Sequence, residues 1–172
     1  TQPLWRDKSP EVHLLGSGPI LGEVLKAQQL LQEAGIASCV WSVTSFTELA
    51  REGQAWERAQ TFADQAVTES NDCTVATNLK DGKPVIAATD YVKAYAEQIR
   101  PYVPGSYQVL GTDGYGRSDT RRALRAFFGV NAQSIAWTAV KKLVSLGVVS
   151  ETKLAQFRLP NSKDLQRDPL EL

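Results

Sequence analysis

The chain has 172 residues, of which 19 are lysine or arginine and 19 are aspartate or glutamate, so its formal net charge at pH 7 is zero. A neutral chain lacks the strongly basic footprint of nucleic-acid-binding proteins and is not drawn to an anionic membrane surface. Its apolar runs are short fragments that could not span a bilayer. The sequence therefore predicts a cytoplasmic domain with a sizeable core and no nucleic-acid or membrane partner.

Histidine, cysteine and methionine are scarce in this chain. Cys39 and Cys73 are too few for a disulfide framework and form no CxxC pair, so reduced thiols are expected. His13 is the single histidine and lies within an apolar run, so without a cysteine cluster we expect no metal site. The absence of methionine, including at position 1, predicts that the chain is a piece of a longer polypeptide.

Short apolar runs alternate along the chain with longer segments in which apolar residues recur at helical spacing. The short runs predict strands over residues 12–15, 39–43, 85–88 and 107–112. The longer segments predict helices that begin near residues 19, 46, 90, 119 and 131. Residues 54–83 are the least legible part, weakly helical and ending in a turn.

Several helix boundaries carry recognisable signals. Ser45 and Glu48 are spaced as a capping box. Asp90 is the expected cap of a helix that stops before Pro101 or Pro104. The last clear helix is expected to bury one apolar face, formed by Ile135, Ala139, Leu143 and Leu146.

This alternation predicts an α/β fold, a three-layer α/β/α sandwich around a mostly parallel sheet of four or five strands. We expect a linker over residues 1–10, one domain over residues 11–158 and a tail over residues 159–172. The carboxyl ends of parallel strands share one edge, where ligands bind when such a domain has any. The glycine-containing loops at residues 16–18 and 111–116 belong to that edge.

The sequence "GTDGYGRSDTRR" after the fourth strand is the richest motif. As an active site it would use Asp113 and Asp119 as acids, and its arginines, Arg122 included, would clamp a carboxylate or phosphate. In a structural interpretation the glycines shape a turn, Ser118 caps the next helix and Asp119 complements the helix dipole. The structural interpretation is favoured, because the spacing supplies no base oriented by a third group.

An intersubunit salt bridge is the expected added role of this loop. We therefore expect no catalytic, cofactor-binding or metal-binding residue in the chain. The expected interface or turn residues are Asp113, Gly114, Gly116, Arg117, Ser118, Asp119 and Arg121.

The sequence "GSGP" at residues 16–19 resembles the opening of a dinucleotide fingerprint but lacks the third glycine. A tight strand-to-helix turn is the favoured interpretation. The alternative is an independent module that binds a small anion or nucleotide between the two glycine loops. The chain has neither a GxSxG elbow nor a GxxxxGK[ST] phosphate loop.

Three long stretches resemble the C-terminal region of the homodimeric-type bacterial pyruvate dehydrogenase decarboxylating component. They are "VHLLGSGPILGEVLKAQQLL", "SVTSFTELAREGQAWER" and "ATDYVKAYAEQIRPYVPGSYQVLGTDGYGRSD". The sequence "GYGRSDTRRALRAFFGVNAQSI" is also similar to the transketolase C-terminal domain. The resemblance covers about residues 11 to 150, and it departs from the family pattern over residues 59–83. A transketolase or another thiamine enzyme is the nearest alternative parent.

The resemblance implies a parent enzyme that depends on thiamine diphosphate and Mg²⁺. Such an enzyme decarboxylates pyruvate and passes the two-carbon unit to the lipoyl group of the dihydrolipoyl acetyltransferase partner. The preceding domains hold the cofactor across a homodimer interface, and their GDG-type motif is absent here. The resemblance thus implies a C-terminal domain that supports packing and dimerisation and is inactive alone.

Overall fold

The computed structural model describes residues 9–63, 73–157, 159 and 165. The predicted linker over residues 1–10 and tail over residues 159–172 lie almost entirely outside these residues. Residues 64–72, in the part of the chain that departs from the family pattern, also lie outside them.

Four strands form one sheet in which every neighbouring pair is parallel. They are β1 (Val12–Gly16), β2 (Ser38–Ser42), β3 (Val85–Ala88) and β4 (Tyr107–Leu110). Their order is β2-β1-β3-β4. The central strands β1 and β3 are buried along their whole length, whereas the edge strands are only partly buried. The predicted α/β fold with a parallel sheet is confirmed.

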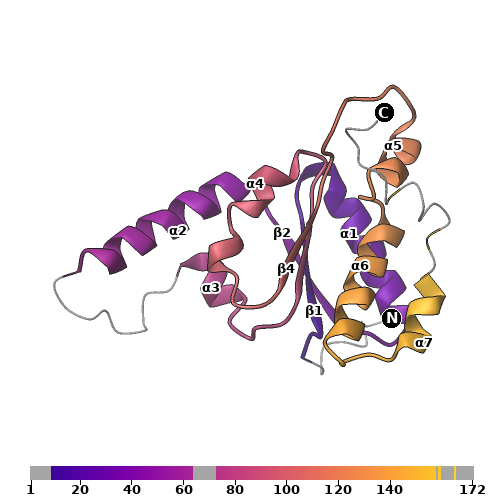
Figure 1. The fold of residues 1–172 in the computed structure, drawn as a ribbon, viewed down its shortest axis with the longest axis horizontal. Coiled ribbons are helices and arrows are strands. Elements are labelled where there is room, and N and C mark those ends of the chain that lie inside the picture. Colours follow the sequence, from indigo (N-terminus) through magenta and orange to yellow (C-terminus); the bar gives the residue numbers. More distant parts are fainter. Residues whose placement is uncertain (1–8, 64–72, 158, 160–164, 166–172) are drawn as a thin grey trace.

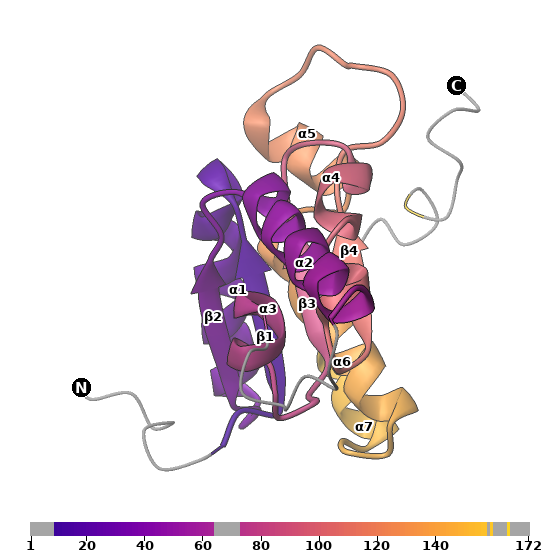
Figure 2. The ribbon, with the colours of Figure 1, turned by 90° about the vertical axis from the view of Figure 1, so that its left-hand side faces the viewer.

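Helices cover both faces of this sheet, as Figures 1 and 2 show. The α-helices are α1 (Leu21–Glu33), α2 (Phe46–Thr61), α3 (Thr74–Asn78), α4 (Lys93–Glu97), α5 (Arg121–Phe127), α6 (Ala132–Ser145) and α7 (Glu151–Leu154). Short 3₁₀ turns flank some of these helices in the described chain: η1 (Gly18–Ile20), η3 (Arg100–Tyr102) and η4 (Ala155–Phe157). α1 and α6 pack on one face, and α2, α3 and α4 lie on the other.

The alternation of side chains along the strands creates two separate cores. Leu14 and Ile86 point toward α1 and α6, and they join a cluster that contains Val24 and Ile135. Leu15 and Val85 point the other way, toward α2, α3 and α4. Burial on both faces explains why the central strands read as continuous apolar runs in the sequence.

Sequence signals set several of the observed boundaries. Ser45 Oγ accepts a hydrogen bond from the backbone N–H of Glu48 at 3.2 Å, which confirms the predicted helix start. The Glu48 carboxylate does not complete the capping box, because it pairs with Arg51 at 2.8 Å. Gly35 adopts a φ of 74° just after α1, a conformation that favours glycine at the end of a helix.

Two predicted boundary details are wrong. Asp90 does not cap a helix: α4 begins after Val92, because Thr112 in the loop that follows β4 holds the backbone carbonyls of Asp90 and Tyr91. Leu146 does not lie on the buried face of α6; it is 51% exposed. α6 ends at Ser145 and the chain reverses at Gly147, so Leu146 falls beyond the packed turns.

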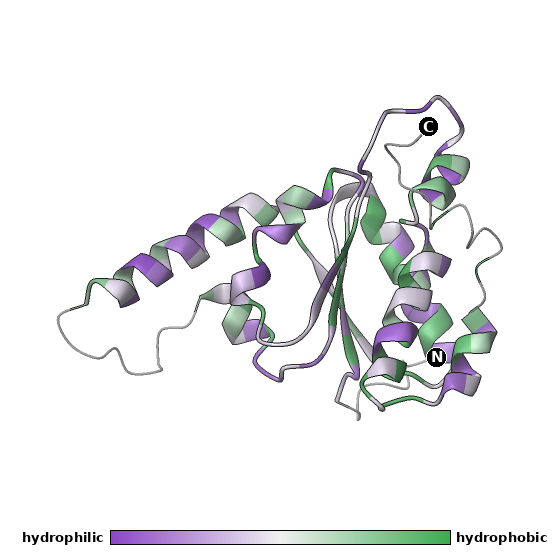
Figure 3. Ribbon diagram, viewed as in Figure 1, coloured by the Kyte–Doolittle hydropathy of each residue, from purple (hydrophilic) through white to green (hydrophobic). Residues whose placement is uncertain are grey.

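Helix α2 projects beyond the body of the domain (Figure 1). Its buried residues, Phe46, Ala50 and Gly53, all lie in its first half. Hydrophilic residues recur along its length (Figure 3), and Phe62, directly after its last residue, is 80% exposed. The first half of α2 therefore anchors it to the sheet.

A buried carboxylate connects three helices on the opposite face. Glu23 of α1 is 8% exposed. Its Oε1 accepts from Lys26 Nζ at 2.9 Å and from Arg125 Nη1 of α5 at 3.1 Å. Its Oε2 accepts from the backbone N–H of Ala132, the first residue of α6, at 3.1 Å. Burial raises the pKa of Glu23, but these hydrogen bonds and the two cations outweigh burial and lower that pKa below its ordinary value.

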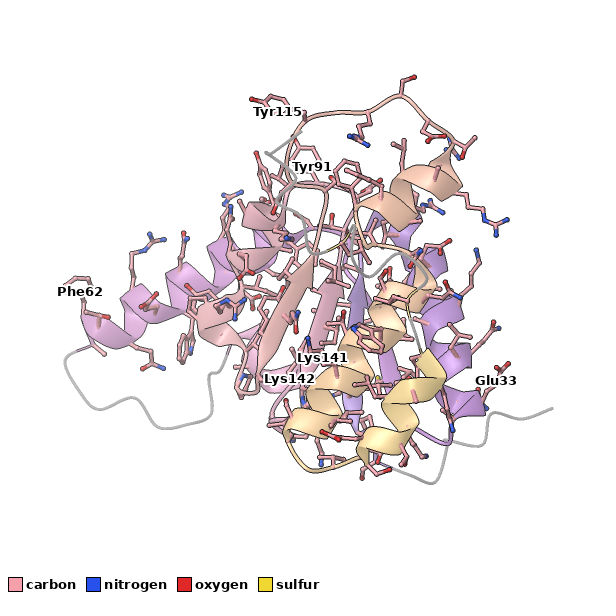
Figure 4. The ribbon with its side chains drawn as sticks, turned by 45° about the vertical axis from the view of Figure 1, so that its right-hand side comes forward. Glu33, Phe62, Tyr91, Tyr115, Lys141 and Lys142 are labelled. Atoms are coloured by element: carbon pink, nitrogen blue, oxygen red, sulfur yellow. The ribbon has the colours of Figure 1, made fainter. Side chains whose placement is uncertain are left out.

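We predict that Glu23→Gln lowers the free energy of unfolding by about 2 kcal/mol at pH 7, because Arg125 and Lys26 lose their counter-charge. Because the folded-state pKa is lowered, this contribution is present above about pH 4.5 and disappears as the pH falls through the folded-state value. Urea denaturation at several pH values checks both points. Glu33→Gln, at the exposed end of the same helix (Figure 4), is the control and should be nearly neutral. Equal effects of the two variants would contradict the assignment.

Two glycines inside helices should respond oppositely to alanine. A Cβ on Gly53 of α2 would overlap the ring of buried Tyr102, so Gly53→Ala should cost about 2 kcal/mol of stability. A Cβ on Gly22 of α1 would meet nothing within 4 Å. Gly22→Ala should therefore stabilise the domain by about 0.5 kcal/mol. Thermal melts of both variants check this opposition; a melting temperature lowered by Gly22→Ala would refute the account of packing.

Candidate functional site

The loop that follows β4 is fastened to the turn that follows β3. The backbone N–H of Thr112 donates to the carbonyl of Tyr91, and its hydroxyl donates to the carbonyl of Asp90, each at 2.9 Å. Asp113 Oδ1 accepts from the backbone N–H of Lys93 at 2.9 Å, and Oδ2 lies 3.3 Å from Lys93 Nζ. Both oxygens of Asp113 are thus engaged in holding the two loops together.

Two of the three glycines in this loop have a structural requirement. A Cβ on Gly111 would lie 2.8 Å from the carbonyl oxygen of Tyr91 and 3.0 Å from the backbone nitrogen of Lys93, so only glycine allows this close approach. Gly114 has a φ of 96°, which side chains rarely adopt. Gly116 has open space around it. The loop motif thus encodes mainly the contact between two loops at the carboxyl edge of the sheet.

The start of α5 differs from the prediction. Thr120 is the N-cap, and its hydroxyl accepts from the backbone N–H of Ala123 at 3.3 Å. Ser118 lies two residues too early to reach the first turn. Asp119 Oδ1 accepts from the backbone N–H of Thr120 at 2.6 Å, so Asp119 braces the cap and does not start the helix.

Arginines from the loop and from α5 line one cavity. Arg117 lies over the ring of Phe127, 4.1 Å from the centroid. Arg121 is exposed, and Arg125 reaches back to Glu23. These three arginines, together with Tyr115 and Pro19, line a cavity of about 480 Å³ that we call the loop cavity. The structure thus brings Arg117 and Arg121 together at one cavity, and adds Arg125 from the helix that carries Arg121.

Exposed tyrosines that the sequence analysis missed lie at this edge of the domain (Figure 4), and one of them, Tyr115, lines the loop cavity. Tyr91, Tyr95 and Tyr115 are 58%, 42% and 70% exposed. The rings of Tyr91 and Tyr95 pack edge to face, with centroids 4.9 Å apart. Figure 4 shows Tyr91 and Tyr115 at the same edge of the domain. No periodicity marks them, because they sit on loops and a short helix. The three tyrosines with Arg117 and Arg121 are called the tyrosine–arginine face.

The other glycine loop, at residues 16–18, is a tight turn. A Cβ on Gly16 would lie 2.9 Å from Val24 Cγ2, so glycine allows α1 to pack closely on β1. The backbone N–H of Ser17 donates to the carbonyl of Ala88, and the Ser17 hydroxyl donates to Thr89 Oγ1 at 3.1 Å. These polar groups are engaged with β3, as the favoured structural interpretation of "GSGP" requires.

His13 is held by two neighbours inside the sheet layer. The indole N–H of Trp41 donates to His13 Nδ1 at 2.9 Å, which places the ring proton on Nε2. His13 Nε2 lies 3.0 Å from both carboxylate oxygens of Asp81. Cys39 pairs with His13 in the β1–β2 register, but both ring nitrogens are already engaged. Burial and the nearby Asp81 raise the pKa of the Cys39 thiol, which does not suit a nucleophile.

The described residues contain no group of three or more histidine, cysteine, aspartate or glutamate side chains that could hold a metal ion. No helix among them is long and apolar enough to cross a membrane. The carboxylates of the glycine loop are committed to backbone and lysine donors. The arrangement therefore provides a pre-formed surface of tyrosine and arginine side chains, and no acid–base pair.

Comparison with known proteins shows the family to which the chain belongs. A family model described as the transketolase-like TK C-terminal domain matches residues 4–131. The pyruvate dehydrogenase E1 component of Cupriavidus necator is 50% identical over 151 residues, which cover 86% of this chain and 16% of that protein. The corresponding Pseudomonas aeruginosa protein is 43% identical over 153 residues, covering 88% and 17%. The chain thus spans about a sixth of the length of these relatives.

Solved structures of transketolases share the fold at low sequence identity. A transketolase from Pichia stipitis aligns with a TM-score of 0.55 at 16% identity, over 85% of this chain and 19% of that one. A Leishmania mexicana transketolase aligns with a TM-score of 0.51 at 17% identity, over 91% and 19%. The chain therefore belongs to the family of transketolase-like C-terminal domains, and it resembles the C-terminal domain of pyruvate dehydrogenase E1 components.

Proposed function

We propose that this chain is the C-terminal domain of a thiamine diphosphate- and Mg²⁺-dependent pyruvate dehydrogenase decarboxylating component. Its role is to pack against the preceding domains and to support the homodimer. The observation that carries this proposal is the tyrosine–arginine face. This exposed surface lies at the carboxyl ends of the strands, the edge at which α/β domains of this kind bind their ligands. Tyrosine and arginine are enriched at the centres of protein interfaces.

The parent enzyme would decarboxylate pyruvate and acetylate the lipoyl group of a dihydrolipoyl acetyltransferase partner in the cytoplasm. Support comes from the relatives named pyruvate dehydrogenase E1 component, at 43 to 50% identity. The Pichia stipitis and Leishmania mexicana transketolases are 16% and 17% identical at comparable coverage of this chain, which favours a pyruvate dehydrogenase parent over a transketolase. More than four fifths of each relative lies outside the matched region, and the cofactor-binding domains would be found there.

Within the described part of the chain, the acids of the glycine loop do not fit thiamine diphosphate and its Mg²⁺. Mg²⁺ takes oxygen ligands, chiefly carboxylates and phosphate oxygens. Asp113 and Asp119, the acids of the glycine loop, are engaged by Lys93 and by the backbone of Thr120. We therefore assign no step of the reaction to this domain.

The tyrosine–arginine face is organised before it meets a partner. The Asp113–Lys93 pair and the two Thr112 hydrogen bonds fix the loops that carry Tyr91 and Tyr115. A surface that is ordered in advance loses little conformational entropy on docking. Within the described part of the chain, Arg121 has no ion-pair partner. A carboxylate on a neighbouring domain or subunit would supply one.

We predict that Arg117→Ala or Arg121→Ala in the full-length enzyme weakens dimerisation or activity by about threefold to tenfold, as loss of a partly exposed interface charge does. Sedimentation velocity over a dilution series and steady-state turnover measure the two effects. Lys141→Ala, on the exposed face of α6 (Figure 4), is the matched control. Unchanged dimerisation and turnover in both arginine variants would remove the interface proposal.

We also predict that the 172-residue chain alone releases no CO₂ from pyruvate when supplied with thiamine diphosphate and Mg²⁺. The physical reason is that its loop carboxylates are committed to structure and provide no cofactor cradle. A ¹⁴C-pyruvate release assay checks this, with a complete pyruvate dehydrogenase E1 component as the positive control. Turnover that scales with chain concentration and persists through purification would disprove the assignment.

A further inference from the structure

A second cavity, of about 750 Å³, lies beside the loop cavity and shares Arg121 and Arg125 with it. It is bounded by α1, by α5 and by the first residues of α6, and we call it the basic cleft. Its cationic lining residues are Lys26, Arg121, Arg122 and Arg125. One carboxylate, Glu23, belongs to the described lining. The chain as a whole is neutral, so this concentration of positive charge is local.

Glu23 does not neutralise the whole cleft. Its two oxygens are saturated by Lys26, Arg125 and the backbone N–H of Ala132, at distances of 2.9 to 3.1 Å. Arg121 and Arg122 are exposed, and within the described chain neither has an ion-pair partner. Among the described residues, therefore, no carboxylate pairs with these two guanidinium groups, which lie beside two cations that share the single negative charge of Glu23.

Neutral donors complete the cleft. Asn131 uses its Oδ1 to cap α6, accepting from the backbone N–H of Ser134 at 2.9 Å, which leaves its amide NH₂ as a donor. The exposed Gln133 contributes a second side-chain amide. Donors thus reach the cleft from α1, from α5 and from the start of α6. A planar carboxylate matches one guanidinium fork, whereas donors from several directions suit a tetrahedral oxyanion.

We propose that the basic cleft binds a small molecule through a phosphate or diphosphate group, with Arg121 and Arg122 as the principal ligands. Lys26 and the amides of Asn131 and Gln133 would hold the remaining oxygens. The inference goes beyond the proposed function, because domain packing requires no ligand on this domain. It also differs in place from the site considered between the two glycine loops, since it uses no residue of either loop.

The test uses the 172-residue chain, whose two cores are complete on both faces of the sheet. Isothermal titration calorimetry is carried out with inorganic phosphate, inorganic pyrophosphate and citrate as separate probes. The variant is Lys26→Gln/Arg122→Gln, which spares the arginines of the loop cavity. The control is Lys141→Gln/Lys142→Gln, which removes two adjacent cations from α6 (Figure 4). Thermal melts confirm that both variants fold, and Arg122→Gln alone replaces the double variant if that one does not.

Saturable binding of pyrophosphate is expected, weakened at least about tenfold in the cleft variant and less than about twofold in the control. Binding should also weaken when NaCl is raised to about 300 mM, because the contacts are ionic. Absence of binding, or equal weakening in both variants, would overturn the proposal. Citrate binding as tight as pyrophosphate binding would reject the phosphate class. Because Arg117 and the tyrosines are untouched, failure here leaves the interface proposal standing.

Discussion

The ion pair between Glu23 and Arg125 determines the position of α5 relative to α1 and α6. α5 has no fully buried side chain, so apolar burial contributes less to its attachment than it does for α1 or α6. Arg125 reaches from α5 to a carboxylate that also accepts from the first backbone N–H of α6. One acidic side chain thereby fixes α5 against α1 and α6 together. Removing one member of such a pair leaves an uncompensated charge, so the arrangement is specific as well as stabilising.

Both cavities at this end of the domain depend on that attachment. Arg121 and Arg125 form the wall between the loop cavity and the basic cleft, and both residues belong to α5. The glycine loop sets the other boundary, because Gly111 and Asp113 fasten it to the turn after β3. The motif that looks most catalytic in the sequence is thus a structural device. It places arginines and tyrosines at one edge of the domain, where the packing role that we propose would use them.

Elements governed by local or periodic signals could be predicted from the sequence. The strand at Val85–Ala88 is a continuous apolar run, and the start of α2 follows from the cap at Ser45. Details fixed by contacts between distant segments could not be predicted. The turn after β3 is held by the loop after β4. In this turn the backbone carbonyl of Asp90 accepts a hydrogen bond from the Thr112 hydroxyl, and the Asp90 side chain does not cap α4.

The same limit applies to the candidate site. The N-cap of α5 is Thr120 and not the predicted Ser118, and Asp119 Oδ1 accepts from the backbone N–H of Thr120. No rule of residue spacing indicates this arrangement. In the sequence, nothing distinguishes Glu23 from other glutamates in helices. Its hydrogen-bond partners Arg125 and Ala132 lie more than a hundred residues away along the chain, and only the fold brings them into contact. The tyrosine–arginine face arises only when the loops after β3 and β4 are placed side by side. Features that depend on contacts between distant parts of the chain therefore required the structure, whereas features set by local sequence could be predicted.

The overhang of α2 has a consequence for local unfolding. Among the described residues, the hydrogen bond from the Tyr102 hydroxyl to Glu57, at 3.3 Å, is the last side-chain hydrogen bond between this helix and the body of the domain. Beyond it, the final turn through Thr61 is held mainly by its own backbone, and a helical turn without tertiary support has little stability in water. Amide hydrogens in that turn would exchange with solvent when the end of the helix frays. Those near Phe46 would exchange only when a larger part of the domain unfolds. A neighbouring domain or subunit that covers Phe62 would slow this amide exchange, so the exchange rate would show whether such a neighbour is bound.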